Sequence, residues 1–176
     1  MATDSQNKWD WRAWAPSTIG GVLTVAQIVL LFFVQRDISG ALRVLGYVAW
    51  GLSFIFGWLP IVTFRKKGGV AEGEAYIKTT RLVDTGIYAI VRHPQGGTAW
   101  LLICLSCILL SQHEWVLALA LVTGAIAYLD TYQLDKRCIA KFGDPYREYM
   151  ARVPRVNPIA GLIRLARRGG RGASAS

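Results

Sequence analysis

Four long apolar blocks constrain the fold of this chain more than any other feature of its sequence. The blocks are Ser17–Val34, Ala41–Phe64, Gln95–Leu110 and Trp115–Leu129. An α-helix rises about 1.5 Å per residue and the hydrocarbon core of a bilayer is about 30 Å thick, so roughly 20 apolar residues cross it. The first two blocks therefore predict full transmembrane helices. The last two are shorter and are separated only by residues 111–114, which predicts a tight helical hairpin that crosses the membrane and returns.

The blocks predict an all-α polytopic integral membrane protein with about four transmembrane helices, and the alternative is a set of helices buried in a soluble core. The chain is 53% hydrophobic, which is high for a soluble domain. Its start carries Asp4 and Asp10 and does not predict a signal peptide. An aromatic belt at the membrane interface would suit Trp9, Trp11 and Trp14.

Lysine and arginine are unevenly distributed between the connections. They gather in residues 65–92 and after residue 129, and residues 111–114 contain none. The positive-inside rule then predicts that both basic segments, and both termini, lie in the cytoplasm. The net charge of +9 is explained by this topology and by attraction to anionic lipids, so we do not expect nucleic-acid binding. We expect one membrane-embedded domain over residues 1–164 and a basic, disordered tail over residues 165–176.

The connection before the third block ends in a polar motif. The sequence predicts a turn at residues 84–86, then a short apolar segment at the membrane interface over residues 87–91. Pro94 suits the first turn of the next helix, because the amide hydrogen that proline lacks would have no partner there. Arg92 and His93 lie just before that helix N-terminus, where free amide groups favour an anionic or polar ligand.

The fourth block runs on into a polar helical segment. Asp135 shares a face there with apolar neighbours by helical spacing. Gly143 is expected to end this helix and Asp144 to cap a second one, with Pro145 at its first position. That second helix gathers Tyr146 and Tyr149 on one side, which predicts an interfacial amphipathic helix.

Cysteine chemistry is not expected. Cys104 and Cys107 form a C-x-x-C within an apolar helix with no histidine or acid nearby, which favours packing residues over a redox or zinc site. We predict no metal site.

Two linked motifs give the sequence a resemblance to a known family. The stretch "TGIYAIVRHP", a helical hairpin and "LDKRCIAKFGDPYREYMARVPRVNP" follow one another over residues 82–158. This arrangement resembles the superfamily of isoprenylcysteine carboxyl methyltransferases and phospholipid N-methyltransferases, integral membrane enzymes that use S-adenosylmethionine. The matching positions of the first motif are Gly86, Tyr88, Arg92, His93 and Pro94, and those of the second are Phe142, Gly143, Tyr146, Tyr149, Val153 and Pro154.

The resemblance implies methyl transfer from S-adenosylmethionine to a lipophilic acceptor dissolved in the membrane. By this resemblance Arg92, His93 and Asp135 are the candidate catalytic residues. The candidate cofactor-binding residues are Gly86, Tyr88, Arg92, His93, Pro94, Asp135, Tyr146 and Tyr149. Asp135 would bind the cofactor's ammonium group, and Arg92 or the helix N-terminus would bind its carboxylate.

The chain also departs from the family pattern. The acidic pair of the family falls at Leu134 and Asp135, and Gly96 stands where a tyrosine is usual. The weakened acidic pair motivates a second hypothesis, a non-catalytic membrane relative that binds lipid or acts as a scaffold. A sterol-reductase-like enzyme is a further alternative. The acceptor stays open between an isoprenylated cysteine carboxylate, a phospholipid amine, a small thiol and another lipophilic metabolite.

Overall fold

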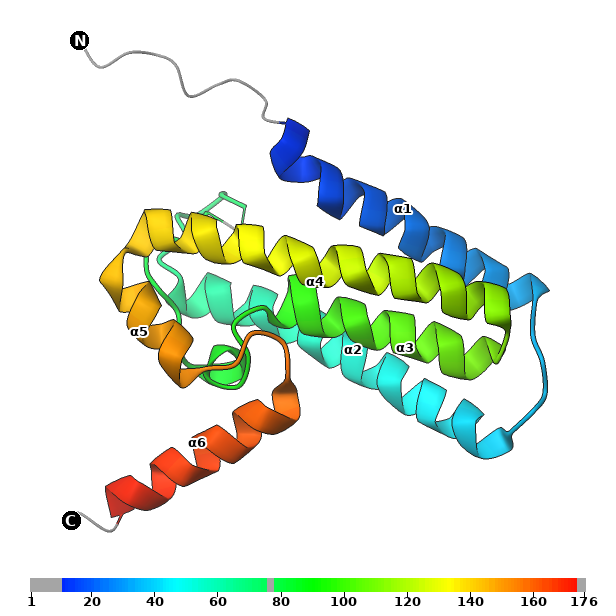
Figure 1. The fold of residues 1–176 in the computed structure, drawn as a ribbon. Coiled ribbons are helices and arrows are strands. Elements are labelled where there is room, and N and C mark those ends of the chain that lie inside the picture. Colours follow the sequence, from blue (N-terminus) through cyan, green and yellow to red (C-terminus); the bar gives the residue numbers. More distant parts are fainter. Residues whose placement is uncertain (1–10, 76–77, 174–176) are drawn as a thin grey trace.

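Four long helices lie side by side in the computed structural model, which describes residues 11–75 and 78–173 (Figure 1). The four are α1 (Trp11–Phe33), α2 (Gly40–Lys67), α3 (Trp100–Ser111) and α4 (Glu114–Phe142). Helix α4 packs against α1 and α3, and α3 packs against α2. The described part of the chain is all-helical, with no strand.

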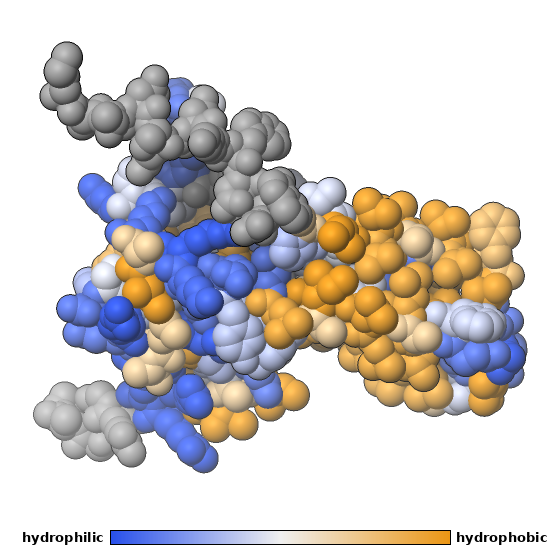
Figure 2. All heavy atoms as spheres, turned by 45° about the horizontal axis from the view of Figure 1, so that its top comes forward, coloured by the Kyte–Doolittle hydropathy of each residue, from blue (hydrophilic) through white to orange (hydrophobic). Residues whose placement is uncertain are grey.

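The predicted transmembrane blocks are confirmed as helices long and apolar enough to cross a membrane. These four spans are Ala15–Phe33, Gly40–Lys67, Pro94–Ser111 and Glu114–Phe142. Large apolar side chains such as Phe33, Phe54 and Leu129 stand exposed on them, as the lipid-facing surface of a membrane protein requires. Figure 2 shows this apolar surface as a broad band, with polar side chains gathered at the two ends of the helices.

The predicted hairpin turn between the last two spans is even shorter than the sequence suggested. Gln112 adopts a left-handed backbone conformation at the end of α3, with φ of 50°. His113 follows as the N-cap of α4, and its Nδ1 accepts a hydrogen bond from the amide of Trp115 (3.3 Å). The turn is tied to the first connection by an ion pair between Arg36 and Glu114 (2.7 Å).

Between α2 and α3 the chain forms two short helical turns, the 3₁₀ turn η1 (Gly86–Ala89) and the π-helical turn η2 (Pro94–Ala99). The sequence placed residues 87–91 at the membrane interface. In the structure Ile87 and Val91 instead lie in the protein core, and Val91 has no exposed surface. Pro94 begins η2, in agreement with the predicted helix start.

Helix α4 ends at Phe142 as predicted, and α5 (Asp144–Arg152) follows. The capping prediction is wrong. Gly143, with a positive φ of 64°, is the N-cap of α5 and Asp144 is its first residue. The Asp144 carboxylate pairs with Arg147 (3.3 Å) instead of accepting a backbone amide, which suits an acidic group in the first turn of a helix.

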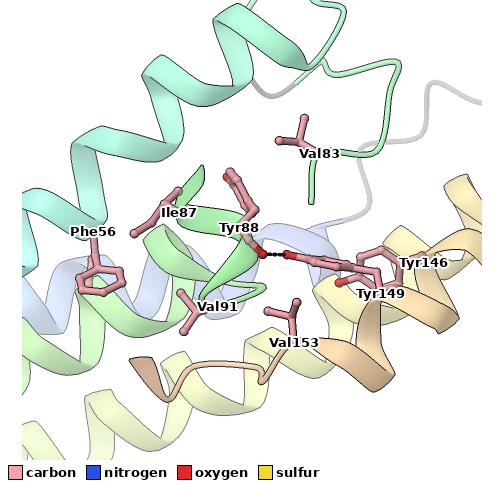
Figure 3. Packing of buried hydrophobic residues seen from close by; sticks show 9 residues of the cluster. Phe56, Val83, Ile87, Tyr88, Val91, Tyr146, Tyr149 and Val153 are labelled. Atoms are coloured by element: carbon pink, nitrogen blue, oxygen red, sulfur yellow. Dashed lines mark hydrogen bonds between the residues drawn. The ribbon is translucent and has the colours of Figure 1, made fainter. Parts of the chain in front are cut away.

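The apolar side of α5 packs on the protein rather than on lipid. Figure 3 shows Tyr149 and Val153 facing the η1 region with Tyr146 beside Tyr149, and all three are at most 3% exposed. An amphipathic pattern predicts that one side is covered, but both a membrane surface and a protein core satisfy it. This cluster fixes the end of the molecule that carries the polar motifs.

A sixth helix, α6 (Pro158–Ala173), covers residues for which the sequence predicted a disordered tail from 165 onward. Its exposed apolar side chains include Ile159 and Leu162, and Arg164 and Arg167 are exposed on the same helix. Such a helix matches the predicted interfacial amphipathic element better than α5 does. The predictions made for residues 1–10 and 174–176 fall outside the described residues.

Candidate functional site

The side chain of Asp135 joins the two sequence motifs at the polar end of the molecule. Its Oδ1 lies 2.7 Å from His93 Nε2 and accepts a hydrogen bond from the Tyr146 hydroxyl (2.7 Å). Its Oδ2 accepts from Arg155 Nε (3.0 Å) and lies 3.5 Å from an Arg92 nitrogen. The carboxylate is only 4% exposed, so these partners replace its hydration.

Backbone hydrogen bonds hold the two motifs in register. The amide of Arg92 donates to the carbonyl of Pro154 (3.0 Å), and the amide of His93 donates to the carbonyl of Arg155 (3.0 Å). The Thr98 hydroxyl donates to the carbonyl of Val156 (2.9 Å). The segment after α5 therefore lies along the segment before α3, and this contact places Arg155 beside Asp135.

Two tyrosines of α5 reinforce this junction from the other side. The Tyr149 hydroxyl donates to the carbonyl of Tyr88 (2.7 Å), as Figure 3 shows. The Tyr88 ring stacks on Phe64 of α2, with ring centroids 4.6 Å apart. Burial raises the pKa of both Tyr146 and Tyr149 well above the usual value for a phenol, so both keep their hydroxyl proton.

A cavity of about 620 Å³ lies next to this junction. Its volume is in the range of small-molecule sites, about 300 to 1,000 Å³. Its aromatic lining residues are Phe64, Tyr88, Trp100, Phe142, Tyr146 and Tyr149. Its charged lining residues are Arg81, Arg92, Asp130, Arg137 and Lys141, and His93 lies among them. Apolar walls with a few convergent polar groups are typical of a ligand site.

Arg92 brings unused hydrogen-bond donors to the cavity wall. Its side chain is buried, and among the described residues its Nε and Nη1 have no hydrogen-bond partner. Buried donors without a partner are costly, and a planar guanidinium matches a carboxylate or phosphate well. The arrangement therefore suits a bound anionic group at Arg92.

Asp135 has a different place from the one expected. Both of its oxygens are engaged by protein side chains, and it is not among the described residues that line the cavity. Arg92 and His93, which it contacts, do line the cavity. The geometry suits a residue that positions Arg92 and His93 better than one that binds a ligand's ammonium group directly.

The other candidate residues divide into two groups. The first group lines the cavity, as expected for binding residues, and consists of Tyr88, Pro94, Tyr146 and Tyr149. Gly86 does not line it. Gly86 has a φ of 63° at the start of η1, a conformation that favours glycine, so it shapes the turn before Tyr88.

The expected helix N-terminus is a π-helical turn in the structure. The amides of Gly97 and Thr98 both donate to the carbonyl of His93 (3.1 and 2.9 Å), so they are used within the turn. Gln95 and Gly96 line the cavity just before them. The start of this turn therefore forms part of the cavity wall, through the two residues that follow Pro94.

Gly96 and Leu134, the two positions at which the chain departs from the pattern that it resembles, meet in space. A Cβ built on Gly96 would lie 3.4 Å from Leu134 Cδ1, and both residues line the cavity. Leu134 comes one helical turn after Asp130, which lines the same cavity. Gly96 and Leu134 therefore shape the same part of the cavity wall.

The sequence analysis missed two residues of the site. Arg155 contacts Asp135, and its guanidinium lies 3.5 Å from the ring centroid of Tyr132. Its position directly after Val153 and Pro154 of the second motif was the available signal. Asp130 gave only a weak signal, an acidic residue inside a transmembrane helix.

Comparisons with protein-family models, curated proteins and solved structures find no match to this chain.

Proposed function

We propose that this protein is an S-adenosylmethionine-dependent methyltransferase of the isoprenylcysteine carboxyl methyltransferase and phospholipid N-methyltransferase type. Its acceptor is a lipophilic molecule dissolved in the membrane. The observation that carries the proposal is the pair of unpartnered Arg92 donors in the wall of a cavity that both motif segments line.

The residues present fit this cofactor. Arg92 would bind its carboxylate, because two buried donors have no other partner among the described residues. Phe64, Leu82 and Val83 supply an apolar wall that suits an adenine ring. When bound, the cofactor supplies a methyl group activated on a positively charged sulfur, so the protein contributes mainly binding and alignment.

His93 is the candidate proton acceptor on the cavity wall. A carboxylate only accepts hydrogen bonds, so the His93 Nε2 that faces Asp135 carries the hydrogen. In the neutral ring Nδ1 is then an acceptor that can take a proton from a substrate amine. Asp135 fixes this tautomer, and Arg155 and Tyr146 hold Asp135 in place.

The acceptor can reach this cavity from the lipid. Two outward grooves of about 410 and 450 Å³ share residues with the cavity, Trp100 and Gln95 in one and Asp130 in the other. Exposed apolar residues of the spans line them, including Phe54 and Trp58 in the first groove and Ile19 in the second. We further propose that the motif-bearing end and both termini are cytoplasmic, because Lys and Arg gather in the two segments that form this end.

Calorimetric titration of the detergent-purified protein with S-adenosylmethionine tests the proposal. We expect saturable binding that weakens about 30-fold in Arg92→Ala, as loss of a charge-assisted contact worth about 2 kcal/mol predicts. Arg147→Ala is the matched control, because this exposed α5 arginine lies outside the cavity. Arg92→Lys, which keeps the charge but loses the planar donors, should fall between the two.

The non-catalytic, lipid-binding relative remains the second candidate, and Leu134 in the cavity wall in place of an acid favours it. Folded wild-type protein that binds no S-adenosylmethionine would exclude the methyltransferase and favour this candidate.

A further inference from the structure

Among the described residues that line the cavity, Asp130 is the sole acid. It is 4% exposed, and its Oδ2 accepts a hydrogen bond from the Ser17 hydroxyl of α1 (2.8 Å). Its Oδ1 has no hydrogen-bond partner among the described residues. Asp135, by contrast, has partners on both oxygens. Asp130 therefore brings to the cavity wall a buried carboxylate with one oxygen that the described residues leave without a partner.

We propose that Asp130 binds a cationic N–H group of the acceptor, which makes the acceptor a lipophilic amine rather than a carboxylate. A buried carboxylate oxygen without a partner costs free energy that an ammonium N–H removes by charge and hydrogen bond together. A carboxylate acceptor would be repelled at the same place. That the bound amine is a methyl acceptor rests on the proposed function. The binding of an amine by Asp130 does not.

The cavity is polarised along α4 in a way that suits this assignment. Arg137 and Lys141 line it seven and eleven residues after Asp130, which is about 10 and 16 Å along the helix axis. The two cationic residues of α4 thus lie toward one end of the cavity, and its carboxylate lies at the other. An amphiphile with an amine would bind at the Asp130 end without facing those cations.

The Asp130 end is also the end that a ligand from the membrane reaches. Asp130 lines the outward groove between α1 and α4 as well as the cavity. Ile19 and Leu129 of this groove are 52% and 62% exposed on the lipid-facing surface. Trp100 lines the same cavity, and an indole face also attracts cations.

The ammonium group of the cofactor is the competing partner for Asp130. In an amino acid the ammonium and carboxylate are attached to one carbon, so both lie close to whichever residue binds the carboxylate. Arg92 contacts Asp135, and Asp130 precedes Asp135 by about 7.5 Å along the axis of α4. This separation favours a different ligand at Asp130.

Binding of hexylamine, compared with hexanoate and hexanol, tests the proposal without requiring catalysis. Calorimetric titrations would be made at about pH 7, where an alkylamine is protonated, in a neutral maltoside detergent with protein-free micelles as the blank. Wild type, Asp130→Asn and Asp144→Asn would be compared. Asp144→Asn removes the same charge from an exposed residue outside the cavity. S-adenosylmethionine would be titrated into each protein in parallel.

We expect wild type and Asp144→Asn to bind hexylamine saturably and at least about tenfold more tightly than hexanoate or hexanol. Asp130→Asn should lose at least about tenfold in hexylamine affinity and keep its S-adenosylmethionine affinity. The preference of the wild type for the amine needs no variant, so it tests the proposal even if Asp130→Asn does not fold.

Equal binding of the three probes to wild type would overturn the proposal. So would a loss of S-adenosylmethionine binding in Asp130→Asn with hexylamine binding retained, because Asp130 would then serve the cofactor. Failure of the wild type to bind S-adenosylmethionine, with the amine preference present, would reject the methyltransferase and leave the Asp130 amine site standing.

Discussion

The Nε2 of His93 and the Oδ1 of Asp135 lie 2.7 Å apart, although 42 residues separate them in the chain. The helical hairpin of α3 and α4 accounts for the separation in sequence, because it leaves the polar end of the molecule and returns to it. Two residues later in the chain, Tyr146 and Arg155, also donate hydrogen bonds to the Asp135 carboxylate and hold this buried contact in place. This dependence leads to the first prediction.

Replacing Asp135 by alanine should destabilise the protein by about 3 to 5 kcal/mol, because Arg92 and His93 lose a buried partner and Arg155 loses its carboxylate. Thermal unfolding in detergent measures the effect. Asp144→Ala, at a side chain that is 91% exposed, should shift stability by no more than about 0.5 kcal/mol. An unchanged unfolding midpoint for Asp135→Ala would show that the carboxylate does not hold the junction together.

Tyr149→Phe should lower stability by about 1 to 3 kcal/mol at neutral pH, because it leaves the buried carbonyl of Tyr88 without its donor. The exposed Tyr47 provides the control substitution to phenylalanine. Unfolding midpoints measured side by side would decide, and equal losses in the two variants would speak against the hydrogen bond.

The same tyrosine predicts a pH dependence. Burial raises the pKa of Tyr149 above the usual value of about 10, so the unfolded chain releases this proton at lower pH than the folded protein. The stabilisation is therefore complete below about pH 10 and is lost as the pH rises above it. Between about pH 10 and 12 the wild type should lose more stability than Tyr149→Phe. Parallel curves for the two proteins in that range would contradict the prediction.

Gly161→Ala should displace α6. A Cβ at this position would lie 1.9 Å from the backbone oxygen of Ile90, which cannot move aside as a side chain can. Limited proteolysis in detergent should then cut residues 155–168 faster than in the wild type. Gly51→Ala is the matched control, since a Cβ there meets no atom within 4 Å. Equal cleavage rates in both variants would mean that α6 does not need the close approach.

Single cysteines test the proposed orientation in the membrane. In a variant without Cys104, Cys107 and Cys138, a cysteine at exposed Glu72 or Arg167 should react with a membrane-impermeant maleimide only from the cytoplasmic side. A cysteine at exposed Asp37 should react only from the opposite side. Labelling of Glu72 and Asp37 positions from one side would reject the four-span topology.

The spans could be predicted from the sequence because length and hydrophobicity are local properties, and lipid imposes both on a crossing helix. The surface against which α5 packs could not be predicted, because a tyrosine-rich face packs equally well on lipid or on a protein core. The role of Asp135 was only partly predictable. Its place on an apolar face was visible, but its saturation by Arg155 depends on the backbone pairing of residues 92–93 with 154–155.

The candidate cavity was less predictable than the helices. Resemblance nominated Arg92 and His93, which line it, and also Gly86, which does not. Asp130 was visible only as an acidic residue inside a transmembrane helix. Its burial, its contact with Ser17 and its unused oxygen arise from the packing of α1 on α4, which no local pattern reveals.

The pairing of residues 92–93 with 154–155 also orders events during biosynthesis. Residues 144–157 are synthesised after all four spans, and until they are in place the carboxylate of Asp135 lacks Tyr146 and Arg155. The cavity is therefore completed last, because Tyr146 and Tyr149 of its wall belong to this final segment. A chain truncated after Phe142 would keep the four spans but would lack two tyrosines of the cavity wall and two partners of Asp135.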